Sequence, residues 1–305
     1  MANHRWIFII IFLIILFFAA SVMAGIISLF IDTEEPITCN VVVIPIKGVI
    51  LSDKASLFDQ QSTSSKDIIG KIKRADDSEH VQAIVFEINS PGGTVVASEE
   101  IVNAIKKTSK PTVSYIREVG ASGAYWVASA TDQIFASRMS ITGSIGVIAS
   151  YLQFSGFIER YNITYQRLTA GKYKDIGSPF KELTYDEKVL FQGQLDLIHD
   201  YFIKDVAESR NLSEESIKEI ETARLFLGIE AKEVGLIDEF GSRDEVIKYL
   251  KKELNTTITL QELTQKQSFF EMLGEVLNEK SFFIGQGIGN SLINAKPTNS
   301  LSIWS

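Results

Sequence analysis

Apolar runs and amphipathic segments alternate along most of this chain of 305 residues. Apolar and β-branched residues fill short stretches at 39–50, 81–88 and 112–116, a pattern typical of buried strands. Residues 66–74 and 95–108 repeat apolar positions at the spacing of a helix. Strands and helices that alternate at these lengths predict right-handed βαβ crossovers and a mostly parallel sheet. The predicted fold class is therefore α/β.

The second half of the chain is predicted to be mainly helical. Residues 184–209 form its longest amphipathic segment, which Thr184 and Glu187 open with the pattern of a capping box. The preceding residues 170–180 are predicted to be a loop. Shorter helices are expected at 125–130, 213–221, 228–234 and 243–253, and short strands at 133–136 and 163–168.

A nearly unbroken apolar run at residues 6–31 is long enough to cross a bilayer as a helix. It predicts a single transmembrane anchor after a short N-terminus, residues 1–5. Arg5 precedes the run and acidic residues such as Asp32 follow it, so the positive-inside rule predicts a cytoplasmic N-terminus. The remainder of the chain is then expected outside the cytoplasm, at the cell membrane.

A cleaved signal peptide is the alternative, because Val22-Met23-Ala24 meets the small-residue rule for a cleavage site. The apolar run continues beyond Ala24, which favours an uncleaved anchor. Residues 36–254 are predicted to form the main folded domain. Residues 255–305 are rich in Thr, Gln, Asn and Ser, and are expected to be a partly ordered tail or an oligomer contact.

Charge and cysteine content exclude several classes of protein. The net charge of −8 and the lack of a basic stripe argue against nucleic acid as a partner. A single cysteine, Cys39, cannot form an internal disulfide. No cysteines and histidines have the spacing of metal ligands, so no metal or cofactor is expected.

The stretch Gly120-Ala121-Ser122-Gly123-Ala124 has the context of a nucleophile at a strand-to-helix turn. Its small residues would let a substrate carbonyl approach Ser122, and the N–H of Gly123 could donate to an oxyanion at the start of the helix. A tight packing turn is the alternative interpretation of the same residues.

Ser122 needs a base, and histidine is poorly supported in that role. His4 precedes the membrane run, His80 lies in a polar turn, and His199 lies in the long amphipathic helix, where a surface or satisfied histidine is the better interpretation. A lysine with a lowered pKa could act instead. Residue types alone do not separate the candidates, which are Lys172, Lys174 and Lys181.

The loop Ser90-Pro91-Gly92-Gly93 follows a predicted buried strand and opens a helix. Two glycines let the backbone approach a ligand and direct N–H groups at it. The loop lacks the endings of a P-loop or a dinucleotide fold. It is predicted to supply half of an oxyanion hole, with Gly123 as the other half, unless it is only a strand-to-helix turn.

Five motifs in this order resemble the signal peptide peptidase A family of membrane-anchored serine proteases, over about residues 41–250. They are Asn89-Ser90-Pro91-Gly92-Gly93, Ala121-Ser122-Gly123-Ala124-Tyr125-Trp126, Thr142-Gly143-Ser144-Ile145-Gly146-Val147, Tyr173-Lys174-Asp175 with Ser178-Pro179-Phe180, and Gly235-Leu236-Ile237-Asp238.

The resemblance implies a Ser/Lys dyad with Ser122 as nucleophile and Lys174 as general base. It also implies Gly92 and Gly123 as oxyanion donors, and Ser144 as a hydrogen-bond partner of the lysine. The implied fold is a crotonase-like or Clp-protease-like spiral of βαβ units. Asp175 departs from the family pattern, since many relatives carry a serine after the lysine, and the helical stretch between Gly92 and Ser122 is slightly short.

The family's short form is thought to assemble as an octameric ring in which each lysine serves a neighbour's serine. The implied substrates are peptides, namely remnant signal peptides with small or apolar side chains. A related peptidase that cuts a specific membrane protein is one alternative, and a non-catalytic membrane-tethered peptide-binding scaffold is another. A coenzyme A-dependent crotonase is disfavoured because such enzymes are soluble and normally use carboxylates.

Overall fold

The computed structural model describes residues 11–23, 36–53 and 62–264. Residues 11–23 are helical, and the rest of the predicted anchor at 6–31 lies outside the described residues, as do residues 1–5 and the tail from residue 265. Across the described ranges, no helix combines the length and hydropathy that a membrane crossing needs. Ile37–Lys54 and Gln61–Leu263 form one compact unit, which is described by itself below.

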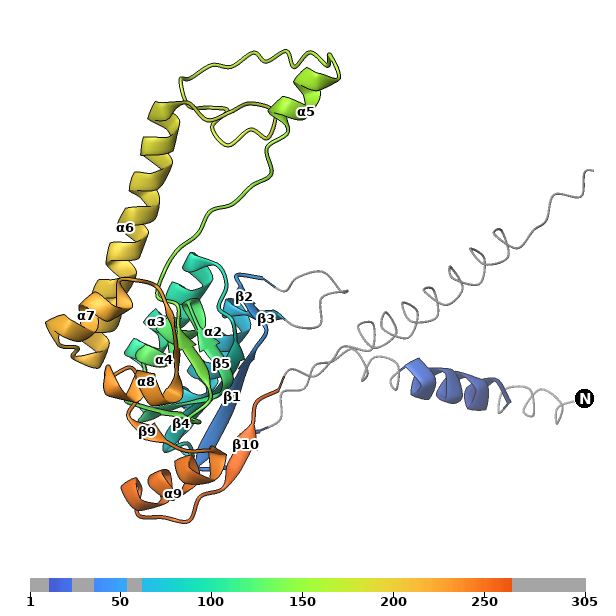
Figure 1. Cartoon of the computed structure of the whole chain (residues 1–305). Helices are drawn as coiled ribbons and strands as arrows, with labels where there is room; N and C mark the ends of the chain where they lie inside the picture. Colours follow the sequence, from blue (N-terminus) through green and yellow to red (C-terminus); the bar gives the residue numbers. More distant parts are fainter. Residues whose placement is uncertain (1–10, 24–35, 54–61, 265–305) are drawn as a thin grey trace, which may run out of the picture. The chain divides into compact units, whose positions relative to one another are not determined.

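A mostly parallel sheet forms the centre of this unit (Figure 1). Its strands run in the order β10-β1-β4-β5-β6-β9, while β7 pairs with β5 and, antiparallel, with β8. The strands of this sheet are β1 (Val41–Lys47), β4 (Ala83–Ser90), β5 (Thr112–Ala121), β6 (Gln133–Ala136), β7 (Ile141–Gly143), β8 (Leu225–Leu227), β9 (Glu239–Phe240) and β10 (Leu260–Glu262). A separate pair consists of β2 (Val49–Leu51) and β3 (Ser62–Ser64).

Helices cover both faces of the sheet. Successive strand residues point to opposite sides, and apolar residues such as those of β1 therefore need a covering layer on each face. Val42 and Ile44 belong to the larger apolar cluster, which includes residues of α2, α3, α4 and α6, whereas Val41 and Val43 pack with α9. The helices are α2 (Ser65–Asp77), α3 (Val95–Lys107), α4 (Gly123–Ser129), α5 (Ser155–Arg160), α6 (Tyr185–Arg210), α7 (Glu214–Ile220), α8 (Gly228–Glu233) and α9 (Arg243–Glu253). The predicted α/β class is confirmed.

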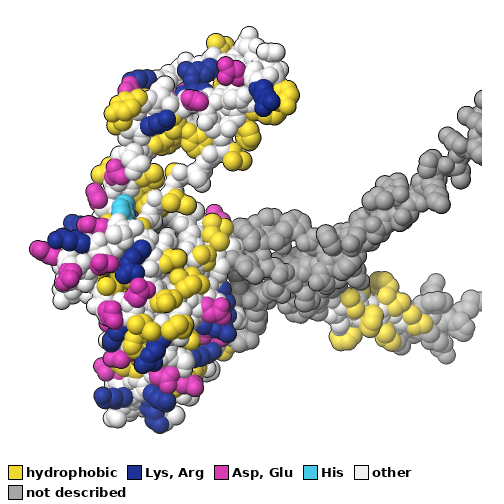
Figure 2. Space-filling view, in the orientation of Figure 1, with side chains coloured by type: hydrophobic (Ala, Val, Ile, Leu, Met, Phe, Trp, Pro, Cys, Tyr) yellow, Lys and Arg dark blue, Asp and Glu magenta, His cyan; other side chains and the backbone are white. Residues whose placement is uncertain are grey.

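Residues 149–184, named the arm here, lie at the N-terminal end of the long helix α6, away from the sheet (Figure 1). The hydrogen bonds and ion pairs described for the arm are made within it or with the first turn of α6. Its surface carries many apolar side chains, including Leu152 at 74% and Leu168 at 102% exposure (Figure 2). The arm therefore has no core of its own to bury these residues.

One predicted strand is missing from the described part of the chain, and the end of the folded domain differs from the prediction. Residues 163–168 do not form a strand, because they lie in the arm, where no other strand pairs with them among the described residues. The folded domain was expected to end at residue 254, yet β10 pairs with β1 in parallel, with Val41 opposite Leu260. The sheet therefore extends about eight residues further.

Candidate active site

Ser122 lies between the end of β5 and the start of α4. Its backbone adopts a φ of 53° and a ψ of −128°, a region that glycine favours. The conformation is held from both sides: the Ser122 N–H donates to the Gly143 carbonyl at 2.8 Å, and the Ser122 carbonyl accepts from the Trp126 N–H at 3.0 Å. The predicted strand-to-helix turn is confirmed, and the turn brings the hydroxyl to the surface of a pocket.

This pocket has a volume of about 690 Å³ and joins segments that are far apart in the sequence. Ser122, Gly123 and Ser144 all line it. Its other lining residues are Pro91, Gly93, Thr94, Val95, Ser98, Trp126, Gly146, Val147, Ile148, Ile198, Phe202 and Ala223. Apolar side chains predominate on its walls, so the pocket can hold an apolar group beside the serine.

Trp126 forms part of the pocket wall and is held in place by residues of α6. Its ring stacks on Phe202 of α6 with centroids 4.7 Å apart, and its indole N–H donates to Asp205 Oδ2 at 2.7 Å. Lys106 of α3 pairs with the other oxygen of Asp205 at 2.6 Å. These contacts attach the C-terminal half of α6 to α3 and α4, and so define the shape of the pocket.

Gly92 does not have a free N–H. Ser90 is fully buried, and its hydroxyl donates to the Gly48 carbonyl at 2.5 Å while accepting from the Gly92 N–H at 3.1 Å. Gly92 itself has a φ of 99°, and a Cβ there would lie 2.8 Å from the Gly123 nitrogen. Gly92 is thus required for close approach of the two loops, while its donor is directed at Ser90.

Gly93 offers the donor that Gly92 lacks. It lines the pocket, and its N–H has no acceptor within the described part of the chain. The neighbouring peptide groups point the other way, because Ile50 donates to the Gly92 carbonyl and accepts from Thr94, both at 2.9 Å. A Cβ on Gly123 would lie 3.5 Å from the Gly93 nitrogen, so the two backbone donors are close together.

Ser144 and His199 lie near the pocket, and they differ in whether their side chains have a hydrogen-bond partner. Ser144 also has a positive φ, 51°, and its N–H donates to the Arg224 carbonyl at 2.9 Å. Its hydroxyl is without a partner among the described residues. His199 Nε2 contacts the Ile145 carbonyl at 3.0 Å, which confirms the interpretation of a satisfied histidine.

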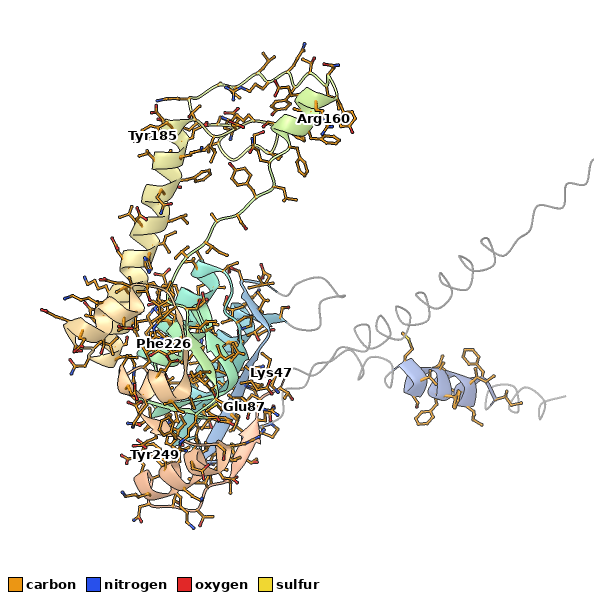
Figure 3. All side chains as sticks on the ribbon, viewed as in Figure 1. Lys47, Glu87, Arg160, Tyr185, Phe226 and Tyr249 are labelled. Atoms are coloured by element: carbon orange, nitrogen blue, oxygen red, sulfur yellow. The ribbon has the colours of Figure 1, made fainter. Side chains whose placement is uncertain are left out.

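Lys174 is not brought to Ser122. It lies in the arm, where Lys172 pairs with Asp186 and Lys181 with Glu187 in the first turn of α6. From Glu187 to Phe202, which contacts the pocket wall, α6 runs 15 residues, or about 22 Å at the rise of an α-helix. Figure 3 shows Tyr185 at the arm end of α6 and Phe226 in the body of the unit.

Ion pairs distinguish the three candidate lysines of the arm. Lys172 pairs with Asp186 at 3.0 Å, and hydrogen bonds to Tyr173 and Asp186 raise its pKa. Lys181 donates to Glu187 at 2.5 Å, which raises its pKa as well. Lys174 is exposed and has no ion pair with any described residue. A base must give up its proton, so the two paired lysines are the poorer candidates.

The fold and the site together define the class of protein. It is an α/β peptidase of the Clp-protease-like type, with a serine at a strand-to-helix turn beside an apolar pocket. The Clp protease family matches residues 49–150. The chain belongs to peptidase family S49, whose sequence model matches residues 104–257. The resemblance to the signal peptide peptidase A family is thereby confirmed.

Relatives with protease names cover most of the chain. "Putative protease MJ0651" of Methanocaldococcus jannaschii is 33% identical over 241 residues, which are 77% of this chain and 75% of the relative. "Putative signal peptide peptidase SppA" of Enterococcus faecium is 32% identical over 222 residues, or 72% of this chain and 64% of the relative. Family and names support a protease.

A solved structure shares the fold. It is a lysine-to-alanine mutant of the 1510-N membrane-bound stomatin-specific protease in complex with a substrate peptide. The TM-score is 0.51 at 18% sequence identity, and the match covers 80% of this chain and 100% of that structure. At this identity the likeness extends to the fold alone.

Two features of the site escaped the sequence analysis. The free donor at Gly93 and the buried hydroxyl of Ser90 depend on which way one peptide group faces. A serine two residues before the first of two glycines is the only sequence signal for this arrangement, and serine side chains commonly bond to backbone groups two residues ahead.

Proposed function

We propose that the protein is a membrane-anchored serine endopeptidase that uses a Ser122/Lys174 dyad formed between subunits. The observation that carries the proposal is the division of the site: the serine, the backbone donors and the pocket lie in the body, whereas Lys174, the arm lysine without an ion pair among the described residues, lies beyond the start of α6. Glu187 at that start is about 22 Å along the helix from Phe202 at the pocket. A second copy of the chain can supply that lysine.

The proposed reaction is acyl transfer followed by hydrolysis. A neutral Lys174 from a neighbouring subunit removes the Ser122 proton while Oγ attacks the carbonyl carbon of the peptide. The N–H groups of Gly123 and Gly93 stabilise the tetrahedral oxyanion. The lysine then protonates the leaving amine, and water, activated by the same lysine, hydrolyses the acyl-enzyme. Ser144 is proposed to hydrogen-bond the incoming lysine.

Gly92 was expected to be the oxyanion donor next to Gly123. Because Ser90 accepts the Gly92 N–H, we assign that donor to Gly93 and a steric role to Gly92. The absent Cβ at Gly92 allows the two loops to touch.

The proposed substrates are peptides with small or apolar side chains, in particular remnants of cleaved signal peptides. The apolar walls of the pocket and the signal peptide peptidase relative support this choice. Cutting of a specific membrane protein is the second candidate, which the stomatin-specific neighbour favours by its name. Released signal peptides and intact membrane proteins, offered in parallel, would distinguish the two.

The proposal has three further parts. Residues 6–31 anchor the protein in the membrane, the catalytic domain lies outside the cytoplasm, and the chains assemble as a ring, which is octameric by family resemblance. The exposed apolar side chains of the arm support assembly, since burial of such side chains is favourable.

The test is the activity of Ser122→Ala and Lys174→Ala in the full-length protein on an apolar fluorogenic peptide. Each is expected to lose about a thousandfold or more in kcat, as the members of a catalytic unit do. Lys172→Ala, a neighbouring exposed lysine, is the matched control and should retain activity. Full activity in Ser122→Ala or Lys174→Ala would refute the dyad.

A further inference from the structure

A chain of alternating charges surrounds the loop that carries Lys174. Arg167 pairs with Asp175 Oδ2, and Lys181 lies 3.2 Å from Asp175 Oδ1. Lys181 also contacts Glu187 Oε1 at 2.5 Å. Two cations thus alternate with two carboxylates, and their charges cancel.

This chain of charges is anchored to α6. Glu187 is the third residue of the helix, and its other oxygen accepts from the Thr184 N–H at 2.9 Å, which completes the capping box. The hydrogen bond from Lys181 lowers the pKa of Glu187 to about 2. Glu187 therefore stays ionised at any pH suited to catalysis, and the loop is fixed to the start of α6.

Asp175 is the residue in this network with the strongest consequence for Lys174. It follows Lys174 directly, yet its side chain is only 11% exposed and faces Arg167 and Lys181, whereas Lys174 is exposed. An anion beside a lysine opposes loss of the lysine proton, which a general base requires. Arg167 binds one oxygen of this carboxylate, and Lys181 lies within ion-pair distance of the other, which has no hydrogen-bond partner among the described residues.

We propose that Arg167 and Asp175 are positioning residues for Lys174, because Arg167 holds the Asp175 carboxylate inside the arm and leaves the adjacent lysine without an anion partner. The inference rests on the proposed role of Lys174 as the base. It explains how an aspartate is tolerated at this position next to a lysine that must deprotonate.

Two further ion pairs lie around the loop, Lys172 with Asp186 and Lys181 with Glu187. Glu182 and Lys188 are exposed charged residues near it. When Arg167 is removed, Asp175 keeps one cation instead of two, and its freed oxygen can turn toward the neighbouring Lys174. The loop then carries one net negative charge more than before.

The experiment measures kcat/KM against pH for the full-length protein with an apolar fluorogenic peptide, since this profile reports the essential base of the free enzyme. In Arg167→Gln the rising limb should move upward by about 0.3–0.7 pH unit, a two- to fivefold loss below the limb, with the plateau at high pH retained. In Arg167→Gln/Asp175→Asn the limb should return, and in Arg167→Lys it should stay near its original position.

Lys204→Gln is the matched control, because it removes one cation from an exposed pair with Glu208 on α6, 3.9 Å apart. It should leave the limb in place. A uniform loss at all pH values in Arg167→Gln, or an unmoved limb, overturns the inference while Lys174→Ala remains inactive. If Lys174→Ala is active, the proposed function fails and the inference fails with it. Thermal melting of each variant verifies folding.

Discussion

The body and the arm use apolar residues in opposite ways. In the body, strand residues such as Val42 and Ile44 have no exposed surface, and the strands pair with one another in a sheet. In the arm, Leu168 is fully exposed and Phe157 is 57% exposed, while the charged side chain of Asp175 is only 11% exposed. The body is stabilised by its own core, whereas the arm is held by charges and turns and presents its apolar residues outward.

This difference divides the candidate site as well. Everything that requires accurate backbone geometry lies in the body: the turn at Ser122 and the donors at Gly93 and Gly123. The proposed base, Lys174, lies in the arm, whose surface carries many exposed apolar side chains. Three experiments test this division between body and arm.

The largest effect is expected from mixing inactive variants. If Lys174 serves the serine of another subunit, Ser122→Ala and Lys174→Ala chains combined before assembly should regain activity. Random equal mixing gives about a quarter of the sites an intact serine and an intact neighbouring lysine, so about a quarter of the original kcat is expected. The readout is peptide cleavage after co-refolding or co-expression. Activity no higher than that of either variant alone would contradict a shared site.

A smaller effect is expected from charges placed on the arm. Leu168→Asp should lower activity about tenfold or more by preventing association, while the melting temperature of the isolated chain changes little, because the side chain is exposed. Ile44→Ala in the body is the opposite case and should lower the free energy of unfolding by about 2–4 kcal/mol. Size-exclusion chromatography and thermal melting check both. Unchanged assembly in Leu168→Asp would show that this face is not an interface.

The smallest effect on activity is expected from the loop Ser90-Pro91-Gly92-Gly93, which carries the proposed oxyanion donor Gly93. Ser90→Ala removes the bonds to Gly48 and Gly92, so the Gly93 donor should lose its orientation, with about a tenfold fall in kcat and little change in KM. Ser114→Ala is the matched control: its hydroxyl is also buried, but has no hydrogen-bond partner among the described residues. Equal kinetic effects in the two variants would count against a role for Ser90.

Sequence patterns predicted the body well because local and tertiary preferences agree there. The helix at residues 243–253, the strand at 133–136 and the capping box of Thr184 and Glu187 occur where they were expected. The arm was less predictable. Ile163 and other apolar residues at 163–168 fit a strand by type, but strands require a neighbour, and the sequence does not specify one.

The candidate site was predictable in its residue types and less so in its geometry. Ser122 and the glycine loop could be found because a nucleophile and its backbone donors follow strands whose ends meet at one edge of the sheet. Residue types alone did not separate Lys174 from Lys172 and Lys181. The family resemblance pointed to Lys174, which is also the one of the three without an ion pair among the described residues. The choice between Gly92 and Gly93 depended on the orientation of one peptide group.

The left-handed backbone at Ser122 has an evolutionary consequence. A non-glycine residue at a φ of 53° and a ψ of −128° is strained by about 1–3 kcal/mol, and glycine would relieve that strain. Ser144, which also lines the pocket, has a positive φ as well, 51°. Mutation to glycine at Ser122 should therefore give a chain that melts at a higher temperature than Ser122→Ala and does not cleave peptides. At this position drift toward stability and selection for activity act in opposite directions.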